Sequence, residues 1–500
     1  CGWRKHRHPV IKKKERRCLS SFFEQDMFCT LRDIICVLSK GKRHADSMRM
    51  DADIMNEEII KRKKRLSSFQ IIILGFAGVI LLGALLLMLP IATKERVVTP
   101  FHETLFTATS ATCVTGLVVQ DTGSYWSVFG QAILLFLIQI GGLGVVTVAA
   151  AFTMLSGKKI SLMQRSTMQE AISAPQVGGI VRLTGFILKG TFLIELVGAL
   201  CLMPLFVKDF GVKGIWYAFF HSVSAFCNGG FDLLGTADNR FVSLTGYAGN
   251  VPVNVIIMLL ILLGGLGFLT WEDIYTKKIH FKKYRLQSKI ILAASIFLLV
   301  LPAAFFFAFE FTDMPLKERL LCSLFQTVTP RTAGFNTADL AGMQGASKAV
   351  MIVLMLIGGA PGSTAGGMKI TTLAVLVTNM RSVFRQKEDM QFFGRRIEDG
   401  AVKTAAAVLS LYLMLFVGGA IAISMAEGLP LGDCLFETAS AVATVGVTLG
   451  ITPGLGIFSQ IILIMLMFMG RVGCLTLIYA AVSGGNKNFS RLPQEKVMVG

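Results

Sequence analysis

Four short stretches of the sequence share a pattern that could bind a cation through backbone oxygen atoms. Each begins with a Phe and reaches a Gly nine or ten residues later, with a Thr or Asn one or two residues before that Gly. They read FTATSATCVTG (106–116), FHSVSAFCNGG (220–230), FQTVTPRTAG (325–334) and FETASAVATVG (436–446). Glycine lets a strand adopt unusual dihedral angles and turn its carbonyl groups toward an axis. Four such strands around one axis would form rings of oxygen atoms that can replace the hydration shell of an ion.

The elements around these stretches also recur, with a period of roughly 110 residues. A long apolar segment precedes each stretch and a second one follows it. The preceding segments are 69–89, 183–206, 290–311 and 404–426, and the following ones are 128–155, 251–271, 348–377 and 458–482. The stretches themselves are too short to span the hydrocarbon core of a bilayer, which is about 30 Å thick. The sequence therefore predicts an all-α polytopic membrane protein: four tandem helix–pore-loop–helix repeats around one pseudo-fourfold ion pore, with eight membrane-spanning helices and four half-helices.

Close helix packing is a simpler explanation for some of these glycines. It is a sufficient reason for the pairs Gly141-Gly142 and Gly264-Gly265 in the following segments. It does not explain why a Thr or Asn precedes each of the four closing glycines. We therefore favour the pore.

Composition and charge agree with a membrane protein. The 500 residues are 53% hydrophobic and 16% charged, with a mean hydropathy of +0.64. The net charge is +18, and from residue 61 onward 24 basic residues lie in the segments that would face one side, including 277–289 and 381–403, against nine on the other side. This asymmetry follows the positive-inside rule and predicts a multi-pass protein of the cell (plasma) membrane with both termini in the cytoplasm. No recognition motif for nucleic acid accompanies the charge, so we expect no nucleic-acid partner.

A Gly-rich run interrupts the apolar segment 348–377. It reads GGAPGSTAGG at 358–367, and its glycines and proline disfavour a helix by about 1 and 3 kcal/mol per residue. It is not a phosphate-binding P-loop, because Met368 separates Gly367 from Lys369 and no strand precedes it. The alternatives are an intramembrane gate and a simple helix break that allows close packing. Lys369 would either join such a gate or extend to the cytoplasmic edge of the membrane.

A single basic residue lies inside the last apolar segment. Arg471 stands where the other three repeats have Gly, and a charge at that depth costs about 2.5–3.5 kcal/mol and usually marks function. It could point into the pore and bind the carbonyl groups of the Gly-rich run. Two acidic residues, Glu103 and Glu437, lie near the starts of the predicted half-helices and would suit the helix dipole or attract cations. We expect Glu195 to pair with Lys189 or a neighbouring helix.

Catalysis and resident metals are not indicated. The chain has six His, and neither an HExxH motif nor a Ser–His–Asp or paired-carboxylate arrangement is visible in its apolar segments. The ten Cys contain no CxxC pair, so neither a disulfide framework nor a zinc site is predicted. We expect no enzyme activity and no cofactor on this chain.

At these motifs the chain resembles the Ktr/Trk/HKT superfamily of potassium transporters. The matching strings are ATCVTGL (111–117), TPRTAGFNT (329–337), GGAPGSTAGGMKITT (358–372) and GRVGCLT (470–476), and the resemblance covers about residues 67–485. The first repeat follows the basic tail directly, so the chain looks most similar to the KtrB-type membrane subunit.

The resemblance implies a role for specific residues. The ion selectivity filter would be formed by Val114, Thr115, Gly116, Asn228, Gly229, Gly230, Thr332, Ala333, Gly334, Thr444, Val445 and Gly446. The gate would be formed by Gly358, Gly359, Gly362, Ser363, Thr364, Gly366, Gly367, Lys369 and Arg471. Gly at all four filter positions favours potassium over sodium. Two departures from the family are the second loop, where Gly229 adjoins Gly230, and Cys474 at a position where Pro is common.

The implied function is potassium uptake through the filter, gated by the Gly-rich run. Sodium dependence is expected, but whether Na⁺ is coupled to transport stays open. The implied partners are a second copy of the chain in a homodimer, the lipid bilayer and a cytosolic nucleotide-binding (RCK-type) regulatory ring. The alternative is a sodium-permeable or weakly selective cation channel or transporter of the same fold. The basic segments 277–289 and 381–403 are either docking surfaces for the ring or ordinary topology determinants that face anionic lipid.

The predicted domain organisation follows the repeats. A basic cytoplasmic tail (1–66) precedes repeat 1 (67–157), repeat 2 (182–275), repeat 3 with the intramembrane loop (288–382), repeat 4 (402–484) and a cytoplasmic C-terminal tail (485–500). The tail 1–66 fits nothing in the family. It is either a disordered membrane-surface segment or the result of a mis-assigned start.

Overall fold

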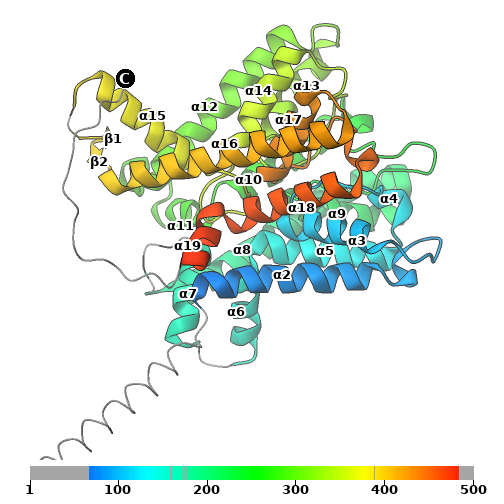
Figure 1. The fold of residues 1–500 in the computed structure, drawn as a ribbon, viewed down its shortest axis with the longest axis horizontal. Helices are drawn as coiled ribbons and strands as arrows, with labels where there is room; N and C mark the ends of the chain where they lie inside the picture. The colour runs from blue at the N-terminus through cyan, green and yellow to red at the C-terminus, as the bar shows by residue number, and fades with distance from the viewer. Residues whose placement is uncertain are drawn as a thin grey trace, which may run out of the picture. The chain divides into compact units, whose positions relative to one another are not determined.

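The computed structural model describes residues 67–482 except 158–159, 173, 175, 177 and 388. These residues form helices joined by short connections and one small hairpin, as Figure 1 shows. The predictions made for the tails 1–66 and 485–500, and for the location of both termini, lie outside the described residues.

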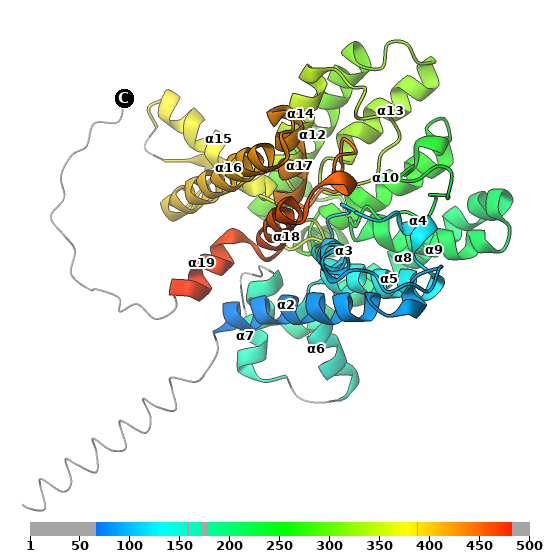
Figure 2. The same ribbon diagram turned by 45° about the vertical axis from the view of Figure 1, so that its right-hand side comes forward.

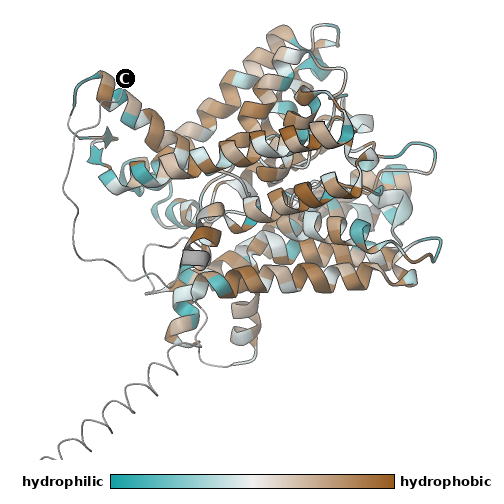
Figure 3. Cartoon of the chain, viewed as in Figure 1, coloured by the Kyte–Doolittle hydropathy of each residue, from teal (hydrophilic) through white to brown (hydrophobic). Residues whose placement is uncertain are grey.

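Four long helices are the longest elements. They are α2 (Ser68–Leu87), α8 (Ile180–Phe210), α12 (Leu286–Phe309) and α16 (Asp399–Glu427). Within the described residues these four are individually long and apolar enough to cross a membrane, and at most 39% of their most apolar stretch is buried inside the protein. Figure 3 shows that much of their surface is hydrophobic. Apolar surface left exposed in this way suits contact with lipid, which agrees with the all-α membrane fold expected from the sequence.

A short helix follows each long one. These are α3 (Phe101–Cys113), α9 (Lys213–Phe226), α13 (Leu316–Val328) and α17 (Leu431–Val442). At 1.5 Å per residue they reach only about 20 Å, so none could cross a bilayer alone. The Phe that opens each sequence pattern is fully buried in its short helix; the four are Phe106, Phe220, Phe325 and Phe436. These aromatic rings fix the short helices in the interior.

The apolar segments that follow the short helices are broken. The pairs are α5 (Val128–Leu143) with α6 (Val145–Leu155), α10 (Val251–Gly265) with α11 (Phe268–Lys277), α14 (Gly345–Leu356) with α15 (Ile370–Phe384), and α18 (Ile457–Val472) with α19 (Cys474–Val482). The first two pairs are bent by 96° and 97°. Counting each of these bent pairs as one span gives up to six candidate spans among the described residues.

The breaks differ in part from what the sequence indicated. The interruption at 358–367 lies between α14 and α15, as predicted. The sequence analysis treated 128–155, 251–271 and 458–482 as single segments, and the structure breaks each of them. The break residues Gly144, Gly267 and Gly473 have φ of 85°, 86° and 90°. This left-handed conformation is accessible to Gly at little cost, so a short glycine motif can end one helix and start another within two residues.

The remaining elements are short. They are α4 (Thr122–Tyr125), α7 (Leu162–Ile172), the 3₁₀ turns η1 (Pro90–Ala92), η2 (Thr245–Tyr247), η3 (Phe281–Lys283) and η4 (Thr452–Gly454), and the antiparallel strands β1 (Gln391–Phe392) and β2 (Arg395–Arg396). Figure 2 shows α3, α17 and α18 near the middle of the molecule, with longer helices around them. This arrangement brings the loops that follow the short helices together.

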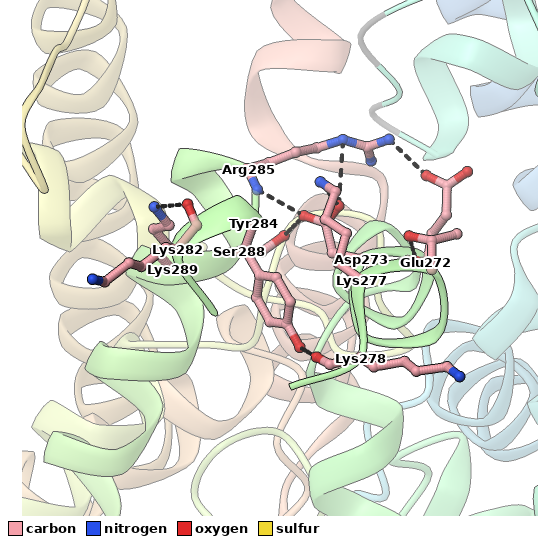
Figure 4. A network of polar contacts seen from close by, with 10 residues as sticks. Glu272, Asp273, Lys277, Lys278, Lys282, Tyr284, Arg285, Ser288 and Lys289 are labelled. Carbon is pink, nitrogen blue, oxygen red and sulfur yellow. Dashed lines mark hydrogen bonds and ion pairs between the residues drawn. The ribbon is translucent and has the colours of Figure 1, made fainter. Parts of the chain in front are cut away.

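A buried carboxylate joins α11 to α12. Asp273 is 1% exposed and accepts hydrogen bonds from Lys277 Nζ (2.6 Å), Arg285 N (3.0 Å) and Ser288 Oγ (2.7 Å), as Figure 4 shows. These bonds fix the start of α12 against the end of α11. Glu272, its neighbour, forms a partly exposed ion pair with Arg285 (2.7 Å).

We expect Asp273→Ala to destabilise the protein by about 3 kcal/mol, because it leaves buried donors without their acceptor. Glu272→Ala is the matched control and should cost at most about 1 kcal/mol, since exposed ion pairs contribute little. Thermal unfolding of the detergent-solubilised full chain measures both. Equal melting temperatures for the two variants would contradict the role of Asp273.

Candidate functional site

The loops that follow the four short helices share a backbone conformation. Within four residues of its helix each loop has a residue with positive φ: Val114 (56°), Asn228 (61°), Thr332 (78°) and Thr444 (52°). Two residues later comes a glycine that also has positive φ: Gly116 (99°), Gly230 (68°), Gly334 (89°) and Gly446 (94°). Residues other than Gly seldom adopt positive φ, and such strain concentrates at functional sites. The conformation recurs at the positions that the sequence pattern marked.

The four glycines form a closed ring. A Cβ atom on each of them would lie against the carbonyl oxygen of the residue that precedes the glycine of a neighbouring loop. The distances are 2.8 Å from Gly116 to Gly229 O, 2.8 Å from Gly230 to Ala333 O, 2.7 Å from Gly334 to Val445 O, and 2.0 Å from Gly446 to Thr115 O. The contacts run from the first loop through the second and third to the fourth and back to the first. The structure thus brings the twelve residues of the predicted filter into one place.

A hydroxyl group at one shared position of the pattern supports each loop. Ser110 Oγ accepts a hydrogen bond from Gly116 N (3.1 Å), and Ser440 Oγ accepts one from Gly446 N (3.0 Å). Ser224 Oγ donates to Phe231 O (2.8 Å), and Thr329 Oγ1 donates to Phe335 O. The sequence analysis missed this position. The signal was present, since a Ser or Thr lies five or six residues before the closing Gly in all four stretches.

Three of the predicted filter residues carry hydroxyl groups without a partner. Thr115, Thr332 and Thr444 are fully buried, and within the described residues their Oγ1 atoms have no hydrogen-bond partner. Buried polar atoms are normally paired, so an unpaired one needs an explanation. Hard cations bind oxygen ligands, and these three oxygen atoms are suitable ligands for one.

The Gly-rich run crosses from the second loop to the fourth. On one side, Thr364 Oγ1 donates to Phe226 O (3.1 Å) and Thr364 N donates to Gly264 O (3.2 Å). On the other side, a Cβ on Gly366 would lie 2.0 Å from Thr444 Oγ1, and one on Gly367 would lie 2.8 Å from Ala443 O. The run therefore lies directly against two of the four loops, in contact with a predicted filter residue.

Two basic side chains hold this run. Arg471 donates to Thr364 O, to Gly141 O and to Gly142 O, the last at 3.1 Å. Lys369 Nζ donates to Ala365 O (2.8 Å) and Gly366 O (3.2 Å). Arg471 thus joins α18, the Gly-rich run and the break after α5. The predicted contact of Arg471 with the carbonyl groups of the run is present in the structure.

Cavities lie on both sides of the ring. One of about 390 Å³ is lined by Arg471, Lys369 and part of the Gly-rich run. A smaller one of about 90 Å³ is lined by the four ring glycines and by residues of the loops that follow them. The two cavities with the ring and the run between them define a candidate path for an ion.

The acidic residues singled out in the sequence have structural partners. Glu195 accepts a hydrogen bond from Gln139 Nε2 (3.3 Å) on α5 and contacts Cys227 Sγ (3.7 Å). It therefore contacts neighbouring elements, the second of the two alternatives. Glu437 is fully buried and accepts hydrogen bonds from Leu449 N (3.2 Å) and Thr452 Oγ1 (2.9 Å).

The two departures from the family have visible consequences. A Cβ on Gly229 would lie 3.0 Å from Ile138 Cγ2, so a larger residue there requires α5 to give way slightly. Cys474 starts α19, directly after the positive-φ residue Gly473. The break between α18 and α19 is present although the position holds Cys and not Pro.

Comparisons with known proteins identify the family of this chain. The chain matches the TrkH family, described as cation transport protein, over residues 61–490. The chain belongs to this family. The potassium/sodium uptake protein NtpJ of Enterococcus hirae is 39% identical over 451 residues, which cover 88% of this chain and 98% of that protein. The Ktr system potassium uptake protein B of Bacillus subtilis is 38% identical over 438 residues, covering 86% and 96% of the two chains.

A solved structure supports the fold. The potassium transporter TrkH from Vibrio parahaemolyticus superposes with a TM-score of 0.65 at 20% identity, over 82% of this chain and 83% of that one. At this identity the match concerns the fold alone. The resemblance expected from the sequence motifs is confirmed, and with it a place among membrane proteins of potassium and cation transport.

We predict that Gly264→Ala lowers the rate of cation uptake more than tenfold and that Gly265→Ala leaves it nearly unchanged. A Cβ on Gly264 would lie 2.0 Å from Phe226 O and 2.7 Å from Thr364 Oγ1, whereas one on Gly265 has its nearest neighbour at 3.7 Å. The first variant must displace the second loop or the Gly-rich run. Uptake of ⁸⁶Rb⁺ by cells, normalised to the amount of protein in the membrane, measures both. Equal uptake by the two variants would contradict the observed packing.

Proposed function

We propose that this chain takes up potassium across the cell membrane through a pore along the axis of the four-loop ring. The closed ring of glycines with recurring positive φ is the observation that carries the proposal. Backbone oxygen atoms around an axis can replace the water molecules that a potassium ion loses on entry. In this proposal the ring is the selectivity filter, formed by the twelve residues that the sequence analysis named. No catalytic activity is proposed.

The proposed architecture has four repeats, eight spans and four half-helices. Each repeat comprises a long helix, a short helix, a ring loop and a broken helix. The short helices end at the ring, and their irregular continuation avoids lipid because it lines a cavity. The recurrence of the loop conformation at all four positions supports this arrangement. The broken helices α5–α6, α10–α11, α14–α15 and α18–α19 would be the second spans of the repeats.

The Gly-rich run would act as the gate. It lies between the ring and the larger cavity, and Arg471 and Lys369 hold it through its own carbonyl groups. A chain segment rich in Gly can change conformation at low cost, and loss of a few hydrogen bonds would free it. The positive charge of the two side chains also opposes a cation at this point. Both effects describe a closed pore that must be opened.

The proposal includes regulation by partners. We propose a homodimer in the plasma membrane, with both termini cytoplasmic, on a cytosolic ring of nucleotide-binding (RCK-type) subunits, and with sodium-dependent transport. The name of the Bacillus subtilis relative describes a part of a Ktr system, which supports a second component. The basic segments 277–289 and 381–403 would face it.

A sodium-permeable or weakly selective cation transporter of the same fold is the second candidate. The Enterococcus hirae relative is named for both potassium and sodium uptake. Gly229 also differs from the residue usual in the family and could loosen the second quadrant of the ring. The two candidates differ in the selectivity of the ring and share its geometry.

We expect the native chain to restore growth of a potassium-uptake-deficient bacterium at low external potassium, and Gly116→Ser to weaken this rescue. A Ser Cβ at Gly116 would lie 2.8 Å from Gly229 O at a φ of 99°, so the ring must open at this contact. Permeation of sodium relative to potassium should rise about tenfold, which corresponds to a difference of roughly 1.4 kcal/mol.

The control for this substitution is Gly432→Ser. Gly432 is outside the ring, and a Cβ atom added there has no neighbouring atom within 4 Å. This variant should transport like the native chain. If the native chain reached the membrane with its cytosolic partner and did not rescue growth, the potassium assignment would fall. Equal selectivity of the Gly116→Ser variant and the native chain would contradict the role of the ring.

Arg471→Gln and deletion of residues 362–366 should each raise ion flux, because both remove hydrogen bonds that hold the Gly-rich run closed. Flux through the purified protein in liposomes without the cytosolic partner measures the effect. Arg165→Gln, which neutralises an exposed arginine on α7, is the control and should leave flux unchanged. Unchanged flux in both variants would contradict the proposal that the Gly-rich run is a gate.

A further inference from the structure

The residues two positions after the ring glycines form a second layer at the smaller cavity. They are Val118, Asp232, Asn336 and Thr448, and all four line the cavity together with the four glycines. The same position in each repeat thus faces the same space. One of these side chains is a carboxylate, one an amide, one a hydroxyl and one apolar, so this layer lacks the fourfold chemical symmetry of the ring. Its oxygen ligands come mainly from the second and third repeats.

The carboxylate of Asp232 is held in place by its own loop. The neighbouring side chains of Phe231 and Leu233 are each 1% exposed, and Phe231 O accepts a hydrogen bond from Ser224 Oγ (2.8 Å). Asp232 Oδ1 accepts one from Leu234 N (3.1 Å). The other hydrogen bond that the carboxylate accepts comes from the backbone of Asp232 itself. This half-buried carboxylate lines the cavity and is bound only by backbone groups of its own loop, so it keeps acceptor capacity for a ligand there.

The amide of Asn336 is held in a similar manner. Its Nδ2 donates to Ala338 O (3.2 Å) and its backbone N donates to Ser243 Oγ (3.1 Å). No donor among the described residues binds its Oδ1. Thr448 is different, because its Oγ1 donates to Glu437 Oε1 and accepts from Gly450 N (2.9 Å). Asp232 and Asn336 therefore provide the two side-chain oxygens that are free for a ligand.

The charges around this cavity favour a cation. Its lining contains two titratable side chains, Asp121 and Asp232, and no basic side chain among the described residues. Both oxygens of Asp121 are already used, since Oδ1 accepts from Phe241 N (2.9 Å) and Oδ2 accepts from Ser124 N (2.7 Å). Asp121 adds negative potential without a free ligand. Asp238 and Arg240 belong to the same connection but are exposed and do not line the cavity.

We propose that Asp232 and Asn336 form an outer binding site for a partly hydrated monovalent alkali cation, which waits there before it enters the ring. The cavity volume of about 90 Å³ exceeds the roughly 10–15 Å³ that a single water molecule needs, so it has room for an ion with some of its water. It therefore suits one ion that has kept part of its hydration shell and has exchanged the rest for the two side-chain oxygens. The site rests on the proposed function, because it supplies the pore that the ring defines.

The same carboxylate makes the site sensitive to external pH. Burial, and to a lesser extent the nearby Asp121, raise the pKa of Asp232 to about 7. The carboxyl group is ionised above this pH and neutral below it. As external pH falls from 8 to 6 the site loses its charge, so the apparent affinity for potassium should fall as well.

Asp232→Asn tests the proposal in the full chain with any partner that transport requires. An Asn oxygen can still accept the hydrogen bond from Leu234 N, so the loop is retained while the charge is removed. We expect the KM for ⁸⁶Rb⁺ at external pH 8 to rise about threefold to tenfold with little change in maximal rate. The native KM should rise between pH 8 and pH 6, and the KM of the variant should not.

Two further variants separate a local site from a general surface effect. Asp238→Asn removes the same charge from an exposed position of the same connection and should keep the native KM and its pH dependence. Asp232→Glu keeps the charge and should restore most of the pH dependence. Equal changes in Asp232→Asn and Asp238→Asn would overturn the proposal, as would a native KM and pH profile in Asp232→Asn. Absence of any cation uptake by the native chain would instead reject the function on which the site rests.

Discussion

Four strands of irregular backbone must meet at one axis inside a membrane protein, and this close approach constrains the rest of the structure. At that depth lipid offers no hydrogen bonds, so each polar backbone group needs a partner or a watery cavity. The ring meets this demand with glycine, because a Cβ on any of its four closing glycines would lie 2.0–2.8 Å from a neighbouring carbonyl oxygen. A Ser or Thr in or directly after each short helix then fixes the loop that follows it. Buried Phe side chains hold those helices in place.

The same use of glycine extends from the ring to the broken helices. A Cβ on Gly141, Gly264 or Gly470 would lie 2.0, 2.0 or 2.2 Å from a carbonyl oxygen at the end of a short helix. The broken helices therefore press directly against the loops, and their breaks leave carbonyl groups that other residues can use. Arg471 binds two of these groups on α5 and one on the run. A movement of the Gly-rich run would therefore displace the ring loops, because the run and the loops are in direct contact.

The sequence predicted the elements that have a period and missed those that depend on three-dimensional contact. The long apolar segments, the short helices and the interruption at 358–367 could be predicted, because hydropathy and Gly spacing report them directly. The bends at Gly144 and Gly267 were missed, since an apolar run has the same composition whether it is straight or bent. The contacts of Glu195 with Gln139 and Cys227 were also not specified, because they join residues far apart in the chain.

The site shows the same division. The twelve loop residues could be named from the repeat and the family resemblance, but the order in which the loops contact one another required the structure. The outer layer with Asp232 and Asn336 becomes visible only when equivalent positions in different repeats are seen to share a cavity. A single carboxylate in a connecting segment carries no such signal in the sequence.

The location of an ion tests the central claim most directly. A crystal structure of the full chain grown with Tl⁺ or Rb⁺ would place the ion by its anomalous scattering. The account predicts anomalous density on the axis, at roughly 3 Å from the carbonyl oxygens of Thr115, Gly229, Ala333 and Val445, the distance expected for a large monovalent cation in a ring of oxygen atoms. Density that lies only elsewhere in the protein, with a ring that contains no ion, would contradict it.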